Sequence, residues 1–200
     1  MTKKLLITVI VVAALVAAIV GTVFYIFITR PSDPTEGIEL TEVDELVTMD
    51  IENDYPSSVR AVTNLWSRFM TCLYNEEYTD EEYEKMIMNM RHLMDSDLQK
   101  QNPEETYISA MKADIEDYRS KNWTISNYTI PDTDDVTYKE IDGVDMALLT
   151  VSYFVKQDTA YAKSYQNYVL KKNSDGLWKI YGYSLKETVQ TDSDGKELEQ

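Results

Sequence analysis

Cysteine, histidine and glycine are scarce in this chain of 200 residues, which has one cysteine, one histidine and six glycines. The single cysteine, Cys72, cannot form a disulfide within the chain, and its helical apolar surroundings favour burial as a small hydrophobic side chain. The single histidine, His92, excludes a histidine-rich zinc site. No glycine-rich loop could surround a phosphate, and no serine stands in a nucleophile elbow. The sequence therefore predicts no metal and no cofactor.

Basic residues are also few, since 19 lysines and arginines face 35 acids and the formal net charge is −16. Lys3, Lys4 and Arg30 flank an N-terminal apolar segment, and no acid precedes Asp33, so the rest of the chain has 35 acids against 16 bases. Such a surface repels phosphate backbones and anionic lipid headgroups. We therefore predict no binding to nucleic acid, and solubility explains the acidity more simply than cation collection.

An uncharged apolar segment runs over residues 5–28. As a helix it would extend about 36 Å, enough to cross a bilayer core of about 30 Å. It is longer than the apolar region of a signal peptide, about 7–15 residues, and it ends in bulky aromatic residues that suit cleavage poorly. Lys3 and Lys4 precede it and only Arg30 follows closely, which favours a cytosolic N-terminus. We predict a cytosolic start and single-pass membrane anchor over residues 1–30, with the remainder extracytoplasmic.

The next segment, residues 31–53, has the composition of an acidic stalk, with Pro31, Pro34 and Gly37 at its start. Weak apolar periodicity between Leu40 and Val47 leaves open a short helix or an extended arm, and a solvated tether is the interpretation we adopt. A folded domain is expected over residues 54–185, followed by an acidic tail at 186–200 that we expect to be mobile.

The first half of the domain has helical periodicity, with apolar residues recurring at spacings of three and four. Thr79 and Glu82 form a capping-box pattern before the second helical segment, and Asn102 is the expected cap of the third. The predicted helices lie at residues 56–74, 79–93 and 102–118.

The period changes to two from Trp123 onward, which indicates strands. Asp142-Gly143 and the segment 173–176 are turn sequences, and a bulge is expected near Asn127. The predicted strands lie at residues 123–130, 136–141, 146–156, 161–172 and 177–183. Three helices followed by an antiparallel meander predict an α+β fold in which helices cover one face of a curved sheet.

The segment 168–180, YVLKKNSDGLWKI, resembles the terminal hairpin of the nuclear-transport-factor-two-like superfamily, also called cystatin-like or SnoaL-like. The resemblance covers about residues 54–185 and implies three helices packed on a cone-shaped half barrel. The layout is also similar to uncharacterised membrane-anchored bacterial proteins that carry such a domain outside the cell, which implies a bacterial, Gram-positive source. Members of the superfamily often dimerise through the sheet.

Enzymes of that superfamily place an Asp, a His–Asp pair or a Tyr inside the cone, but none of these motifs maps onto this chain residue by residue. His92 lies close to Asp95 and Asp97 in the sequence, although a histidine that interacts with a helix end is the simpler interpretation. The other acids that we considered lie at helical spacing on what we take as a solvated face of the third helix: Asp114, Glu116 and Asp117. We therefore predict no enzymatic activity.

A pocket between the first helix and the concave face of the sheet is the candidate binding site. Its expected lining is aromatic: Trp66, Phe69, Tyr153, Tyr165, Trp178 and Tyr183. In the simpler alternative, these side chains fill the cone and leave no cavity. A second use of the aromatic residues is an outer surface for a protein partner or a second copy, formed by Tyr161, Tyr165, Tyr168, Tyr181 and Tyr183.

Three functions from different classes follow. The favoured one is a single-pass, extracytoplasmic binding or interaction module without enzymatic activity. The second is a scaffold subunit of a secretion or conjugation channel, because bitopic scaffold proteins of type IV secretion systems share this layout of an anchor and a half barrel. The third is a hydrolase or isomerase, which needs an acid or histidine pointing into the cone.

Overall fold

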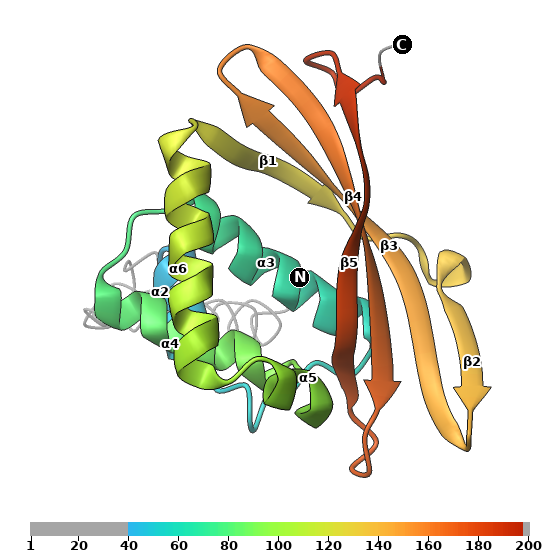
Figure 1. Ribbon diagram of the computed structural model, residues 1–200. Coiled ribbons are helices and arrows are strands. Elements are labelled where there is room, and N and C mark those ends of the chain that lie inside the picture. Colours follow the sequence, from blue (N-terminus) through green and yellow to red (C-terminus); the bar gives the residue numbers. More distant parts are fainter. Residues whose placement is uncertain (1–39, 198–200) are drawn as a thin grey trace, which may run out of the picture. The chain divides into compact units, whose positions relative to one another are not determined.

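The computed structural model describes residues 40–197 (Figure 1). The predicted anchor at residues 1–30, residues 31–39 of the predicted stalk and residues 198–200 lie outside the described residues. Within 40–197, no helix is both long and apolar enough to cross a membrane.

The described part begins with a helix where a tether was expected. Helix α2, Glu42–Thr48, opens with a capping box in which Thr41 and Asp44 satisfy each other's backbone N–H groups. Two of its side chains, Val43 and Leu46, are buried. Ile51 follows the helix and is also buried in the core. Residues 40–53 therefore pack into the domain, which corrects the prediction of a stalk extending to residue 53.

The predicted helices are confirmed with small shifts of their ends. Helix α3 covers Val59–Asn75 and is capped by Ser58, whose hydroxyl accepts from Ala61 N at 3.1 Å. Helix α4 covers Asp80–His92, and its capping box of Thr79 and Glu82 is present as predicted. Helix α6 covers Glu104–Ser120.

One short helix, α5 at Ser96–Gln101, was not predicted, because its six residues are too few to show a period. The side chain of Asp95 caps it by accepting from Asp97 N at 3.0 Å. Asn102 is the last residue of this turn rather than the cap of α6, which begins after Pro103 without a side-chain cap. The predicted role of Asn102 is therefore wrong.

Five antiparallel strands form one sheet in the order β1-β3-β4-β5, and β2 pairs with the first residues of β3 while β1 pairs with its last residues. The bounds are β1 Trp123–Thr129, β2 Thr137–Ile141, β3 Val144–Gln157, β4 Ala160–Lys172 and β5 Trp178–Thr191. A single turn of 3-10 helix, Thr133–Asp135, precedes β2. The expected bulge is present between Ile125 and Asn127. In the turn before β3, Asp142 and Gly143 both have positive φ, 52° and 77°, as a type I′ turn requires.

Strand β5 continues eight residues beyond the expected end at residue 183 and pairs with β4 as far as Thr191. Residues 186–191, predicted as part of a mobile tail, therefore belong to the sheet. Two register shifts in this pairing leave Tyr181 and Lys186 without a direct partner. Each extra residue reverses which side chains face the helices, so the period of two is interrupted along β5.

The helices cover one face of the twisted sheet (Figure 1). The alternation of β3 is confirmed, because one set of its side chains is buried against the helices: Ala147, Leu149, Val151, Tyr153 and Val155. The architecture is therefore α+β, with helices followed by a five-strand antiparallel sheet packed against them.

Candidate functional site

One end of the layer between helices and sheet is filled by aromatic side chains. Trp66 and Phe69 of α3 and Tyr168 of β4 are fully buried there. Tyr183 of β5 closes the group, with its ring centroid 5.4 Å from that of Trp66 and 6.1 Å from that of Tyr168. At this end the aromatic side chains fill the space between helices and sheet.

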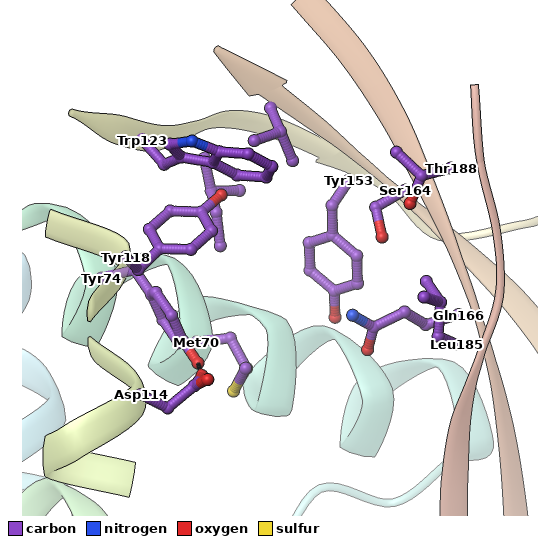
Figure 2. A pocket seen from close by; sticks show the side chains of 12 residues that line it. Met70, Tyr74, Asp114, Tyr118, Trp123, Tyr153, Ser164, Gln166, Leu185 and Thr188 are labelled. Atoms are coloured by element: carbon purple, nitrogen blue, oxygen red, sulfur yellow. Dashed lines mark hydrogen bonds between the residues drawn. The ribbon is translucent and has the colours of Figure 1, made fainter. Parts of the chain in front are cut away.

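The other end of the same layer holds a cavity of about 420 Å³ (Figure 2). Six elements each contribute two side chains to its wall, in chain order Met70, Tyr74, Asp114, Tyr118, Trp123, Ile125, Tyr153, Val155, Ser164, Gln166, Leu185 and Thr188. The volume falls within the range of about 300–1,000 Å³ that is typical of ligand pockets. The cavity is open along β5, where Leu185 and Thr188 remain exposed.

Three aromatic rings form the wall below β1. Tyr118 of α6 lies between Tyr74 of α3 and Trp123 of β1, with centroid separations of 4.8 Å and 5.3 Å. The interplanar angles are 82° and 67°, so the rings stand nearly at right angles to one another. Edge-to-face packing of this kind stabilises the wall beyond the area that it buries.

A polar group closes the inner end of the cavity. The Tyr153 hydroxyl lies 2.8 Å from the Ser67 hydroxyl and 2.8 Å from the Tyr168 hydroxyl. Tyr168 in turn donates to Gln166 Oε1 at 3.1 Å, and the Gln166 amide nitrogen lies beside the Tyr153 hydroxyl on the same side of the cavity (Figure 2). Burial raises the pKa of Tyr153 to about 12, so this phenol is neutral near pH 7 and can donate or accept a hydrogen bond.

An acidic group lies at the opposite side of the cavity, where the Tyr74 hydroxyl donates a hydrogen bond to Asp114 Oδ2. Burial raises the pKa of the Tyr74 phenol, and the bond to Asp114 raises it further, so Tyr74 remains a neutral donor. We had assigned Asp114 to a solvated helix face, and its side chain is indeed exposed, but it also lines the cavity. The spacing along the helix could have predicted this position. Asp114 lies three residues after Met111 and four before Tyr118, so the three side chains share one face of the helix.

Only one of the six residues predicted to line the pocket, Tyr153, does so. Trp66, Phe69 and Tyr183 belong to the filled end. The Tyr165 hydroxyl donates to Glu197 Oε1 at 2.7 Å, away from the cavity wall. The sixth, Trp178, is partly buried against the core, with its ring centroid 5.9 Å from that of Tyr138, and does not line the cavity.

The predicted outer set of tyrosines is also divided. Tyr161 and Tyr165 are an even number of residues apart on β4 and share a face, whereas Tyr168 falls on the other face and is fully buried. Tyr183 pairs with Tyr168 and faces the helices with it. The prediction that Tyr168 and Tyr183 lie on the outer side is therefore wrong, and the role of that side in binding a partner stays a prediction.

His92 does not form a dyad with the neighbouring acids. Its Nδ1 lies 3.9 Å from Glu52 Oε1. Asp95 and Asp97 instead lie 3.5 Å and 3.4 Å from the Lys171 ammonium group. Within residues 40–197, no group of three or more His, Cys, Asp or Glu side chains could hold a metal ion.

The chain belongs to a family described as a domain of unknown function (DUF6715), whose model matches residues 1–183. The match covers the apolar segment at 5–28 together with the helices and most of the sheet, so both are parts of one family architecture. No curated protein matches the chain.

Proposed function

We propose that this family member is a membrane-tethered binding module that holds a small, mostly apolar ligand in the cavity and catalyses no reaction. The observation that carries the proposal is the cavity of about 420 Å³, with apolar walls and polar groups at two opposite sides. Met70, Ile125, Val155 and Leu185 supply the apolar surface. Hydrogen-bonding groups at Tyr153 and in the Tyr74–Asp114 pair would fix the orientation of the ligand.

The composition of the wall favours binding over catalysis. The enzymatic alternative needs an acid or histidine in the cavity, and Asp114 is the one acid among the lining residues. It accepts a hydrogen bond from the Tyr74 phenol, whose pKa is raised, so this phenol gives up no proton readily near pH 7. The lining contains no cysteine, lysine or histidine that could act with it.

The apolar segment at residues 5–28 supports the tether, and the sparse positive charge beyond Arg30 supports an extracytoplasmic position for the domain. The helices and the single antiparallel sheet are compatible with the half barrel that the 168–180 hairpin suggests. The proposal therefore includes membership of the nuclear-transport-factor-two-like superfamily and a bacterial cell membrane as the location.

Methyl NMR of the full chain in detergent micelles tests the binding proposal. Para-tert-butylphenol is a suitable probe, because it combines a compact apolar body with one hydroxyl group. We expect it to shift the methyl signals of Met70 and Ile125, which lie beside the cavity. Met86 and Ile87 of α4 are internal controls, because both are fully buried and line no pocket in the described part of the chain, so their signals should change little. Equal shifts at all four residues, or no shift at the highest soluble concentration of the probe, would refute the proposal.

A further inference from the structure

The charge of the cavity wall is unbalanced. Among the twelve lining residues, Asp114 is the only acid, and none is a lysine, arginine or histidine. A ligand with a negative charge would therefore meet a carboxylate without any compensating group. A ligand with a positive charge would neutralise it.

The bases on α6 and at its C-terminal cap that could neutralise Asp114 are engaged elsewhere. Lys112 Nζ lies 2.7 Å from Asp80 Oδ1, and Lys121 Nζ lies 2.6 Å from Asp117 Oδ2. Arg119 donates to the Leu73 carbonyl at 3.1 Å, and its guanidinium group lies 4.9 Å from the centre of the Tyr78 ring.

Asp114 itself forms no ion pair with any residue in the described part of the chain. Its one hydrogen bond there is the bond that its Oδ2 accepts from the Tyr74 hydroxyl. Tyr74 fixes the position of the carboxylate without removing its charge, since a neutral phenol donates only a hydrogen bond. The second carboxylate oxygen therefore remains available to a ligand.

The aromatic rings beside Asp114 add a second feature that suits a cation. The rings of Tyr74, Tyr118 and Trp123 come from three different elements and stand at steep angles to one another. Aromatic faces attract ammonium groups through the quadrupole of the ring, and tryptophan and tyrosine do so most strongly. Rings set at right angles around a corner can contact a rounded alkylammonium group from more than one side.

We propose that the ligand of this cavity is an organic cation, held with its ammonium group beside Asp114 and the rings of Tyr74 and Tyr118. This inference rests on the proposed function, namely that the cavity binds a ligand. The apolar body of the cation lies along Met70 and Val155. Its far end accepts or donates a hydrogen bond at Tyr153 or at the Gln166 amide group.

A bare metal ion fits the same site poorly. Hard cations require several oxygen ligands around them, whereas the lining supplies one carboxylate and no second acid. Most of the surface beside that carboxylate is aromatic carbon. An alkylammonium group needs no coordination sphere and gains from contact with such carbon, so an organic cation matches the wall better than an inorganic one.

Two probes of nearly equal shape separate charge from fit. Para-tert-butylphenol is neutral. In para-hydroxyphenyltrimethylammonium, a positively charged nitrogen replaces the quaternary carbon of the tert-butyl group. We expect the full chain to bind the cation at least about tenfold more tightly, which corresponds to about 1.4 kcal/mol. The measurement is a methyl NMR titration that follows Met70 and Ile125, with the micelle concentration held constant.

Two variants on α6 assign the preference to one carboxylate. Asp114→Asn should bind the cation only as tightly as it binds the neutral probe, because the amide keeps a hydrogen-bonding oxygen in place and removes only the charge. Asp117→Asn is the matched control, because it removes a charge that Lys121 already pairs, and it should keep the tenfold preference. Circular dichroism of each variant shows whether it is still folded.

The outcomes separate this inference from the proposed function. If neither probe shifts Met70 and Ile125, the proposed function itself fails. If the neutral probe binds and the cation binds no more tightly, the cavity binds ligands but the assignment of an organic cation is wrong. A preference for the cation that survives in Asp114→Asn would also overturn the assignment, because it would come from the net charge of the chain.

Discussion

The layer between helices and sheet has a filled end and a hollow end, although both are built from the same strands. Strand β4 contributes Leu170 and Tyr168 to the filled end, where both are fully buried. Four residues before Tyr168 on the same face, Ser164 contributes only a hydroxymethyl group to the cavity wall. The backbone pairing with β3 is continuous across both ends. Along β3 and β4 the cavity therefore results from the size of the side chains, whereas β5 has a bulge at Lys186 beside it.

The boundary between the two ends is polar. Tyr153 lines the cavity, and its hydroxyl joins Ser67 and Tyr168 of the filled end in one chain of hydrogen bonds. A buried polar network of this kind is stabilising only when every member has a partner. The filled end thus holds in place the phenol that the cavity presents to a ligand, which gives the two ends different but linked roles.

Replacing one tryptophan at each end should give the largest difference in stability between the two ends. Trp66→Ala should lower the free energy of unfolding by about 3–5 kcal/mol, because it empties a fully buried site. Trp123→Ala should cost less, about 1–2 kcal/mol, because that side chain is half-buried and already borders a void. Urea unfolding followed by circular dichroism measures both. Equal losses would mean that the two ends are packed alike.

The dependence of stability on alkaline pH tests whether the tyrosine hydroxyls at the boundary are shielded from water. Burial raises the pKa of Tyr153 and of Tyr168, so the folded state holds both phenols neutral. Their contribution to stability is fully present below about pH 10, the unfolded pKa of tyrosine, and is lost as pH rises above it. We expect the unfolding free energy to be level between pH 7 and 8 and to begin falling near pH 8.5, because burial raises the pKa of the Cys72 thiol to about 12. Above pH 10 it should fall by up to about 1.4 kcal/mol per pH unit for each such phenol.

Tyr168→Phe tests whether the filled end carries this dependence. The variant loses hydrogen bonds to Tyr153 and Gln166, so it should start about 1 kcal/mol less stable at pH 7. Its stability should then fall less steeply than that of the wild type above pH 10. Recovery on return to pH 8 is the control for irreversible damage. Parallel curves for the two proteins would show that Tyr168 has no raised pKa.

The sequence allowed the elements to be predicted better than the void between them. Capping boxes and the spacing of apolar residues, every second residue in a strand and every third or fourth in a helix, involve only nearby residues. The sequence therefore predicted α4 and the alternation of β3. Helix α2 was one of two alternatives, and the sequence favours a tether there because many acids surround just two side chains that are buried in the structure, Val43 and Leu46. The end of β5 was missed because bulges at Tyr181 and Lys186 interrupt its period.

The site was predicted less well for a different physical reason. Aromatic residues mark a core, and the prediction took large side chains as the lining of a pocket. In the structure the large residue Trp66 fills space, and the small residue Ser164 leaves it empty. Whether a small side chain leaves a void depends on the distance to the helix packed against it. The apolar periodicity of a single strand contains no information on that distance. The stripe from Met111 through Asp114 to Tyr118 was the one readable signal, and a polar residue on it was taken as solvated.

Larger side chains introduced at the two ends should have small effects on stability that still differ clearly between the ends. Ala147→Leu places three extra carbons in the filled part of β3 and should cost about 1–3 kcal/mol, because a packed core cannot make room for them. Ser164→Leu points the same bulk into the cavity. It should change the free energy of unfolding by less than about 1 kcal/mol, since the gain from new apolar contact offsets the lost hydroxyl.

The same variant links the stability of the hollow end to its use. A leucine at position 164 would occupy part of the cavity opposite Tyr153, so Ser164→Leu should weaken binding of para-tert-butylphenol at least about tenfold while the protein stays folded. Ser152→Leu is the matched control, because Ser152 pairs with Tyr165 on the opposite face of the sheet. A cavity that stays empty for a functional reason should lose its ligand when filled, yet lose almost no stability. If Ser164→Leu unfolds the domain as readily as Ala147→Leu, the space beside it is not free and the contrast between the two ends disappears.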